Sequence, residues 1–406
     1  MKHNILYLSY DGLTDPLGQS QVLPYLIGLS HKGYSLTIIS FEKQNNYKTK
    51  GSAIESLCSK NRIDWIPLKY RKQPPIVSTL FNVFELWQEV KKLFQKERFQ
   101  IVHCRSYVTS LVGLQAKSKW GVKFIFDMRG FWADERAEGG LWNLKNPFYY
   151  LVYKYFKKQE RKFLDKADAV VSLTNTSKEY LIKSFSIDSK KITVINCCVD
   201  TDLFNPENVS ESTKMDLKTE LGQTKETLVL LYLGSTGTWY MLKEMLVFFK
   251  ALCQKHSDSQ FLIITPDPPR PIQKTASETG IDLSKIIIRK AEREEVPLYI
   301  SISNYSILLI KPVFSKQASF PTKLGEVLSM GLPVVANTAV GDNDYLFGSG
   351  NIGVLIQGFE QENFTEAVRK LVSFKETADL RSFAMNNFSL KKGVELYDRV
   401  YQTILL

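Results

Sequence analysis

Short apolar runs rich in β-branched and aromatic residues alternate with helical stretches along both halves of this chain. The alternation is typical of parallel sheets built from βαβ units. In the first half, strands are predicted at Ile5–Ser9, Leu36–Phe41, Ile63–Leu68, Ile101–Cys104, Phe124–Asp127, Ala169–Leu173 and Ile192–Ile195. In the second half, they are predicted at Leu228–Leu233, Phe261–Thr265, Ile286–Ile288, Ser306–Ile310, Leu332–Ala336 and Gly353–Ile356. The pattern predicts an α/β chain with two facing, Rossmann-like, doubly wound domains and a ligand cleft between them.

The length supports two domains, because 406 residues exceed one typical hydrophobic core. A polar segment, Cys197–Ser212, is predicted to link the halves. We expect a first domain over residues 1–205, a second over 206–385, and a C-terminal helix over 386–406 that returns to the first domain.

Cysteine usage and the N-terminus bear on the cellular compartment. The five cysteines show no C-x-x-C spacing, which argues against a zinc site or a disulfide framework and favours a reducing environment. The opening residues are too few and too polar for a signal peptide, and no apolar run approaches about 18 residues. We therefore expect a cytoplasmic protein.

The formal net charge of +11 comes largely from the first half of the chain. No zinc-finger, basic-zipper or RNA-binding motif accompanies it, so nucleic acid is not an expected partner. One basic stretch, Lys154–Lys166, belongs to a predicted amphipathic helix that could contact a membrane. Asn146 can cap and Pro147 can begin an amphipathic helix, with one side formed by Phe148, Val152, Tyr155, Phe156 and Phe163, and the other by Lys154, Lys157, Lys158, Arg161 and Lys162. Such a helix either lies on an anionic membrane surface, which would make the protein peripheral on the inner face of the plasma membrane, or packs its aromatic side on the core.

The segment Ser319–Ala336 carries the strongest chemical signal. Thr322 is predicted to cap a short helix that Gly331 ends, and the helix places Lys323 and Glu326 at the carboxyl edge of the second sheet. A helix start at that edge attracts anions. The alternative is an exposed ion pair between the lysine and the glutamate, which are three residues apart.

A second candidate loop, Gly234–Thr238, directly follows a predicted strand and precedes a predicted helix. Its glycines, Gly234 and Gly237, allow close backbone approach, and the hydroxyls of Ser235, Thr236 and Thr238 can donate to phosphate or sugar oxygens. An ordinary tight turn remains the alternative.

Two other patterns are weaker. The G-x-G-x-x-G match at Gly348–Gly353 runs into a strand rather than a helix, which argues against a dinucleotide loop. The D-x-D triplets Asp200–Asp202 and Asp342–Asp344 can in principle chelate a metal, but Asp200 is expected to cap a turn instead.

Several motifs together resemble those of the family-four glycosyltransferases of the GT-B fold, of the bacterial polysaccharide-biosynthesis type. The resemblance rests on D-G-L-T-D-P-L-G-Q-S-Q (11–21), V-I-N-C-C-V-D-T-D-L-F (194–204), Y-L-G-S-T-G (232–237), A-E-R-E-E-V-P-L-Y-I (291–300) and P-T-K-L-G-E-V-L-S-M-G-L-P-V-V-A (321–336). It implies that Glu326 holds the ribose of a nucleotide sugar, and that Gly18 and Gln19 belong to an acceptor-side loop.

This sequence departs from the family pattern at two places. Ala318 stands where the family carries the first glutamate of E-x₇-E, and Ser235 and Tyr240 stand near the usual arginine and lysine after the first donor-domain strand. Lys323 is expected to supply the missing positive charge, with help from Arg289, Lys290 or Lys311 at neighbouring strand ends.

On the acceptor side, His103, Asp127 and Arg129 stand at predicted strand ends and are the candidate catalytic residues. Asp127 lies where the family often carries a catalytic-site H-D pair, here with Phe126 in place of the histidine. A structural histidine and a mutual charge pair between Asp127 and Arg129 remain the alternatives.

The expected function is transfer of a sugar from a nucleotide-sugar donor to a sugar or lipid-linked acceptor. The resemblance implies retention of configuration, no cofactor and no obligatory metal. A nucleotide-sugar epimerase of the same architecture and a non-catalytic sugar-nucleotide-binding subunit remain alternatives.

Overall fold

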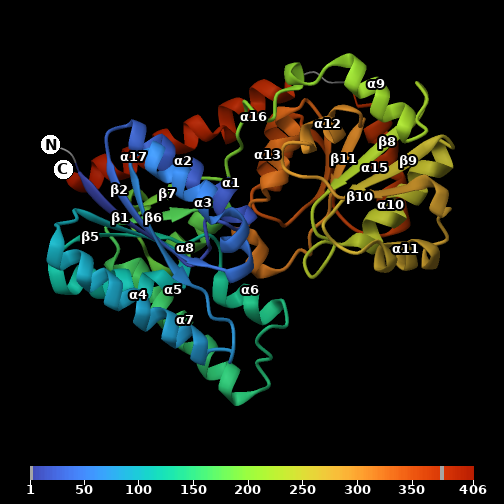
Figure 1. Ribbon diagram of the computed structural model, residues 1–406. Helices are drawn as coiled ribbons and strands as arrows, with labels where there is room; N and C mark the ends of the chain where they lie inside the picture. The colour runs from blue at the N-terminus through green and yellow to red at the C-terminus, as the bar shows by residue number, and fades with distance from the viewer. Residues whose placement is uncertain (1–2, 375–378) are drawn as a thin grey trace. The chain divides into compact units, whose positions relative to one another are not determined.

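The computed structural model describes residues 3–374 and 379–406, and the chain divides into two compact units. The first unit extends to Cys198 and also includes Leu390–Leu406, and the second unit is Val199–Ser389 (Figure 1). Each unit contains one parallel sheet with helices around it, as the sequence predicts.

The first unit contains a seven-stranded sheet in the order β3-β2-β1-β4-β5-β6-β7. Its strands are β1 (Asn4–Ser9), β2 (Ser35–Glu42), β3 (Ile63–Lys69), β4 (Ile101–Arg105), β5 (Lys123–Asp127), β6 (Ala169–Ser172) and β7 (Ile192–Val194). Its helices are α1 (Pro16–Gln21), α2 (Leu23–His31), α3 (Gln44–Lys60), α4 (Val77–Lys96), α5 (Ser106–Trp120), α6 (Trp132–Glu138), α7 (Pro147–Lys166), α8 (Asn175–Phe185), the 3₁₀ turn η1 (Ser189–Lys191) and α17 (Leu390–Leu405). The strand order reverses between β1 and β4.

The second unit contains a six-stranded sheet in the order β10-β9-β8-β11-β12-β13. Its strands are β8 (Leu228–Leu233), β9 (Ser259–Ile264), β10 (Ile286–Arg289), β11 (Tyr305–Leu308), β12 (Val334–Asn337) and β13 (Gly353–Ile356). Its helices are η2 (Pro206–Asn208), α9 (Glu211–Glu220), α10 (Leu242–Lys255), α11 (Pro269–Glu278), η3 (Leu283–Lys285), α12 (Val296–Ser301), η4 (Phe314–Ala318), α13 (Thr322–Ser329), α14 (Asn343–Gly350), α15 (Gln361–Val372) and α16 (Leu380–Phe388). Here the order reverses between β8 and β11.

All thirteen predicted strands form, with ends that differ from the prediction by at most two residues. Central strands such as β4, β6 and β12 are buried along their whole length. Helices cover both faces of such a sheet, so these strands are mostly apolar rather than alternating, although β4 also buries His103 and Arg105. That property is what made them recognisable in the sequence.

The segment predicted as a linker is partly built into the second unit, and the boundary falls at Cys198 rather than at residue 205. Phe204 is buried, and the Arg381 guanidinium donates hydrogen bonds to the carbonyls of Thr201, Phe204 and Ser329. Asp200 accepts from the amides of Asp202 and Leu203, so it caps a turn as expected. The polar composition of this segment suggested a linker without fixed contacts. Instead, the buried Phe204 and the hydrogen bonds from Arg381, which is distant in sequence, fix it to the second unit.

The return of the chain to the first unit begins at Leu390, because α16 belongs to the second unit. Helix α17 packs on α2, where a side chain at Gly28 would overlap Val394. The Tyr34 hydroxyl donates to Asp398 at 2.7 Å, and Lys32 lies 3.7 Å from the same carboxylate. The close approach at Gly28 and the polar contacts of Asp398 therefore hold α17 against α2 in the first unit.

Helix α7 begins as predicted, because the Asn146 side chain accepts from the Phe148 amide at 2.9 Å and Pro147 is the first helical residue. Its predicted aromatic side is divided between two environments. Phe156 and Phe163 are buried in the core, whereas Phe148 and Tyr155 are about half exposed at 54% and 48%. Core packing therefore explains the aromatic residues in the second half of α7 but not those in the first half. No helix in the described part of the chain is long and apolar enough to cross a membrane.

Candidate functional site

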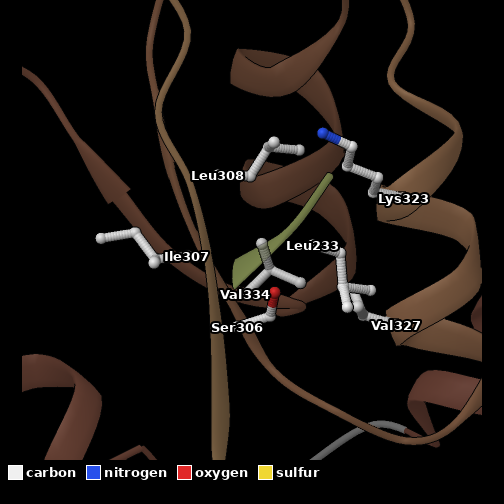
Figure 2. Close-up of a pocket in the computed structure, with 7 residues that line it drawn as sticks. All are labelled: Leu233, Ser306, Ile307, Leu308, Lys323, Val327 and Val334. Atoms are coloured by element: carbon white, nitrogen blue, oxygen red, sulfur yellow. The ribbon is translucent and has the colours of Figure 1, made fainter. Parts of the chain in front are cut away.

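The candidate donor site lies at the carboxyl edge of the second sheet, where the strand order reverses between β8 and β11. Ligands of open α/β sheets bind outside the carboxyl ends of the strands at such a point. A small pocket there is lined by Leu233, Ser306, Ile307, Leu308, Lys323, Val327 and Val334 (Figure 2). Lys323 is the one charged side chain of this lining, and Figure 2 shows its amine turned away from Val327 and toward Leu308.

Gly234 makes room for that amine. It has a φ of +103°, and a Cβ atom at this position would overlap the Nζ and Cε atoms of Lys323. Its amide donates to the Ile264 carbonyl at 2.8 Å, which ties the loop after β8 to the neighbouring strand. A glycine is therefore required here both by the backbone conformation and by the lysine.

The Lys323 ammonium lies 3.8 Å from the ring centroid of Tyr240 and 5.1 Å from that of Tyr232. Its Nζ atom is buried and has no hydrogen-bond partner among the described residues. Burial lowers the pKa of Lys323 to about 8, although Glu326 and Asp267 oppose that shift. An ammonium held against aromatic faces with its donors unused is suited to an anionic ligand.

Thr322 does not cap its helix, contrary to the prediction. Pro321 is the N-cap residue of α13 and Thr322 is the first helical residue, with no side-chain capping hydrogen bond. The helix end was predicted correctly, since Gly331 has a φ of +76° just after α13. Threonine is a common N-cap residue, but here Pro321, with its extended backbone, occupies the capping position.

Glu326 lies one turn beyond Lys323 on α13. Its carboxylate accepts from the Arg293 Nη1 atom at 3.1 Å, and its side chain is 12% exposed. Burial raises the pKa of Glu326, and Arg293 and Lys323 partly offset that effect. Arg293 was not expected at the site, although it lies in the segment 291–300 that carries the family resemblance. Arg289, which was expected to help, lies 3.9 Å from Glu220 instead.

The loop Gly234–Thr238 is only partly available to a ligand. Thr236 donates both its amide and its hydroxyl to the carboxylate of Asp267, at 2.6 and 2.9 Å. Asp267 follows β9, so its carboxylate occupies the position beside Thr236 where a ligand phosphate was predicted. Ser235, Gly237 and Thr238 remain exposed. The amide and hydroxyl of Thr236 are therefore engaged by Asp267 in this conformation, and a donor-binding role for the loop Gly234–Thr238 stays a prediction.

A further cation stands beside this loop. Lys316, in η4, has its ammonium 3.9 Å from the ring centroid of Trp239. It lies two residues before Ala318, which is buried. The segment that lacks the first glutamate of the family pattern thus contributes a buried lysine, a feature that sequence spacing did not indicate.

Gly18, which is expected to belong to an acceptor-side loop, is closely packed, and its role toward an acceptor stays a prediction. It lies within α1, where a Cβ atom would overlap the Gly12 carbonyl oxygen. Gln19 donates its side-chain amide to the Thr14 carbonyl at 2.9 Å. The loop is organised by Glu42, at the end of β2, which accepts from the amides of Leu13 and Thr14. The buried carboxylate of Glu42 was missed because it lies about thirty residues away in sequence.

His103, Asp127 and Arg129 do come together, but around α17. The Tyr397 hydroxyl donates to Asp127 at 2.9 Å, and the Tyr401 hydroxyl lies 2.7 Å from His103 Nδ1. His103 Nε2 is 3.4 Å from Asp127. These two contacts fit a neutral histidine that donates from Nε2 to Asp127 and accepts at Nδ1 from Tyr401. All three side chains are at most 8% exposed.

The charges in this cluster are set by burial and by mutual contacts. Burial lowers the pKa of His103 despite the opposing effect of Asp127. Burial alone would raise the pKa of Asp127, but Arg129 and His103 hold it below its usual value. An ionised aspartate, a neutral histidine and two tyrosine hydroxyls therefore tie the sheet to the C-terminal helix. A catalytic role for these residues stays a prediction.

We expect Asp127→Asn to lower the free energy of unfolding by about 3 kcal/mol, because it leaves Arg129 buried beside a neutral group. Urea unfolding followed by circular dichroism measures this, with the exposed Asp64→Asn as the matched control. A variant as stable as the parent, but slower in transfer, would favour the catalytic role over the structural one.

Metal ligation receives no support from the acidic triplets. Asp200 is used in its turn, and Asp344 accepts from the Ala339 amide at 3.0 Å. Within residues 3–374 and 379–406, no group of three or more His, Cys, Asp or Glu side chains is placed to hold a metal ion.

Comparison with known proteins identifies the family. Residues 25–203 match the family described as Glycosyltransferase Family 4, and residues 214–384 match the family described as Glycosyl transferases group 1. A D-inositol 3-phosphate glycosyltransferase from Nocardioides is 22% identical over 68% of this chain, and the match spans 60% of that relative's length. The UDP-Gal:alpha-D-GlcNAc-diphosphoundecaprenol alpha-1,3-galactosyltransferase of Escherichia coli is 25% identical over 80% of this chain and 82% of its own.

Solved structures share the fold. A glycosyltransferase from Rickettsia africae has a TM-score of 0.70 at 19% identity, over 100% of this chain and 99% of its own. Anabaena HepE, in complex with UDP and glucose, has a TM-score of 0.69 at 14% identity, over 98% of both chains. With matched segments in both units and this shared architecture, the chain belongs to the family-four glycosyltransferases, which have the GT-B fold.

Proposed function

We propose that this protein transfers a sugar from a nucleotide-sugar donor to an acceptor, and that the donor binds at the carboxyl edge of the second sheet. One observation carries the proposal: a buried lysine ammonium, with no hydrogen-bond partner in the described part of the chain, faces a glycine of positive φ at the point where the strand order reverses. In this assignment Lys323 contacts the diphosphate, and Glu326, oriented by Arg293, accepts from the ribose hydroxyls.

Transfer breaks the bond between the anomeric carbon and the diphosphate oxygen and forms a bond from that carbon to an acceptor oxygen. Negative charge grows on the leaving diphosphate, so a preorganised ammonium stabilises the transition state more than the ground state. We propose that configuration is retained and that the leaving diphosphate takes the acceptor's proton. Lys323 then supplies the positive charge without an obligatory metal, and no further cofactor takes part.

The proposed acceptor is a sugar carried on a lipid diphosphate, in cell-surface polysaccharide or glycoconjugate synthesis. The match to the Escherichia coli relative spans most of both chains, and that relative's name supports a lipid-diphosphate-linked sugar as the acceptor. The carboxyl edge of the first sheet, with Gln19, His103, Asp127 and Arg129, is the proposed acceptor side, and the inner membrane face is the proposed location.

The proposal is tested by screening nucleotide sugars for thermal stabilisation and then measuring transfer to a lipid-diphosphate-linked sugar. Product that forms only when both substrates are present supports a transferase. Turnover of donor without acceptor would instead indicate an epimerase, and donor binding without any turnover would indicate a non-catalytic subunit.

The pH dependence of donor use gives an independent check on Lys323. A lysine with a pKa of about 8 is charged below that pH and neutral above it. We therefore expect kcat/KM for the donor to fall above about pH 8, approaching a tenfold loss per pH unit. The same profile for Lys323→Met should lack this ionisation. An unchanged profile in that variant would assign the ionisation to another group.

A further inference from the structure

Exposed apolar side chains concentrate on the first turns of α4 and α7 and on the segment before α7. Of eighteen large hydrophobic side chains exposed in the described part of the chain, ten lie in residues 77–84 and 141–155. Leu80, Phe81, Phe84, Leu141 and Leu151 are each 61% to 67% exposed. We call the full set the α4–α7 surface: Val77, Leu80, Phe81, Phe84, Leu141, Leu144, Phe148, Tyr150, Leu151 and Tyr155.

The fold explains why these side chains lack packing partners. Helices α4 and α7 both pack on α5, so the three belong to one layer on one face of the first sheet (Figure 1). The Tyr107 hydroxyl, near the start of α5, donates to Glu160 of α7, and Tyr153 donates to Asp134 of α6. The turns of α7 before Tyr153 therefore extend past the start of α5 and the contacts with α6.

The two helix starts share one edge of the sheet. Helix α4 follows β3, and α7 follows β5 after α6 and a loop; each then returns toward the amino end of the next parallel strand, so both begin on the carboxyl side of the sheet. Adjacent helices in a layer lie about 8 to 10 Å apart, which puts the axes of α4 and α7 about 20 Å from each other across α5. The exposed side chains thus form one extended surface rather than two unrelated patches.

The segments that carry this surface contain charges of one sign only. Residues 69–84 and 141–158 contain no aspartate or glutamate, and their basic residues are Lys69, Arg71, Lys72, Lys145, Lys154, Lys157 and Lys158. Arg71 pairs with Glu85, and Lys157 pairs with Asp134 and Glu160. The other five are not in an ion pair among the described residues, and Lys154 lies 5.7 Å from the ring centroid of Tyr150.

We propose that the α4–α7 surface docks on an anionic lipid bilayer, with its aromatic and aliphatic side chains in the interface and its lysines at the headgroups. Apolar contact and attraction to anionic lipid together give stable peripheral binding, where either one alone is marginal. A second copy of this chain fits poorly, because it would bring the same excess of cations to the interface. The inference rests on the proposed function in one respect: docking brings the acceptor edge of the first sheet to a lipid-linked acceptor.

The test is co-sedimentation of the full chain with vesicles of phosphatidylcholine, with and without about one third phosphatidylglycerol. We expect binding to the anionic vesicles only, reversed by high salt. Phe81→Glu with Leu151→Glu should lower the partition coefficient at least about tenfold. The matched control is Met215→Glu with Tyr345→Glu, since these side chains are 66% and 68% exposed in the other unit.

Charge is tested separately with Lys154→Glu and Lys158→Glu, which should weaken binding to anionic vesicles by a similar factor. Lys157 is left unchanged, because its ion pairs with Asp134 and Glu160 are part of the fold. Equal loss in the Met215 and Tyr345 control, or no binding of the parent to anionic vesicles at low salt, would overturn the proposal. So would a dimer in sedimentation velocity that Phe81→Glu and Leu151→Glu dissociate.

Nucleotide-sugar affinity and transfer to a short-chain, water-soluble acceptor are measured on the same variants. A variant that no longer binds vesicles but transfers normally to the soluble acceptor shows that docking is separate from catalysis, and this result supports the proposal. Vesicle binding by a parent that transfers to no acceptor would overturn the proposed function while leaving the docking surface in place.

Discussion

Lys323→Met is expected to lower kcat by about 10² to 10³-fold, the usual cost of removing one preorganised group that stabilises developing negative charge. The dissociation constant of the nucleotide sugar should change by less than about tenfold, because the ground-state diphosphate gains less from the ammonium than the transition state does. Methionine retains an unbranched stem beside Tyr240 and Gly234, so the pocket should keep its shape. Steady-state kinetics at saturating donor and calorimetric titration measure the two quantities.

Lys274→Met is the control for this experiment, since Lys274 is 79% exposed on α11. It should leave both quantities unchanged. If Lys323→Met retained the parent's kcat, the ammonium would not be the group that stabilises the leaving diphosphate.

Glu326→Gln is expected to raise the dissociation constant of the nucleotide sugar about ten- to hundredfold with little change in kcat, because charge-assisted hydrogen bonds contribute about 1.5 to 3 kcal/mol. Glutamine preserves the size of the side chain and can still accept from Arg293, whose Nη1 atom lies 3.1 Å from the carboxylate. The measured loss therefore reports the ligand contact rather than a collapse of the site.

A donor with a deoxygenated ribose makes the assignment specific. The parent protein should bind such a donor about as weakly as Glu326→Gln binds the normal one, and the variant should lose little more. Additive losses from the variant and the deoxygenated donor would mean that Glu326 does not contact the ribose. Glu362→Gln, an exposed glutamate on α15, is the matched control.

Local patterns were enough to predict the strands and several helix ends. The buried strands are mostly apolar, and Asn146, Asp200 and Gly331 act through backbone groups within a few residues of themselves. Thr322 failed because the adjacent Pro321 occupies the capping position. Such errors concern competition between neighbours, and they move an element by only a residue or two.

The partners of the site residues could not be predicted in the same way. Arg293 is 33 residues from Glu326, and Asp267 is 31 residues from Thr236, yet each pair is in hydrogen-bonding contact. The strand order brings loops after different strands to one edge, and nothing in the local sequence states which side chains then meet. Spacing therefore indicated that Lys323 and Glu326 lie together, since they share one helix, but it did not indicate Arg293, Asp267 or Lys316, which come from other elements.

What the sequence by itself determined was the class of fold, the alternation of elements and the segment that carries the donor motif, because burial on both faces of a sheet and backbone capping leave periodic local marks. What only the tertiary structure decided was the burial of each charge. His103 and Asp127 face the tyrosines of α17, almost three hundred residues away, and the first turns of α7 extend past the helices that cover the rest of it. The energy of an ionisable or apolar side chain depends on which groups exclude water from it, and those groups are chosen by the packing of distant elements.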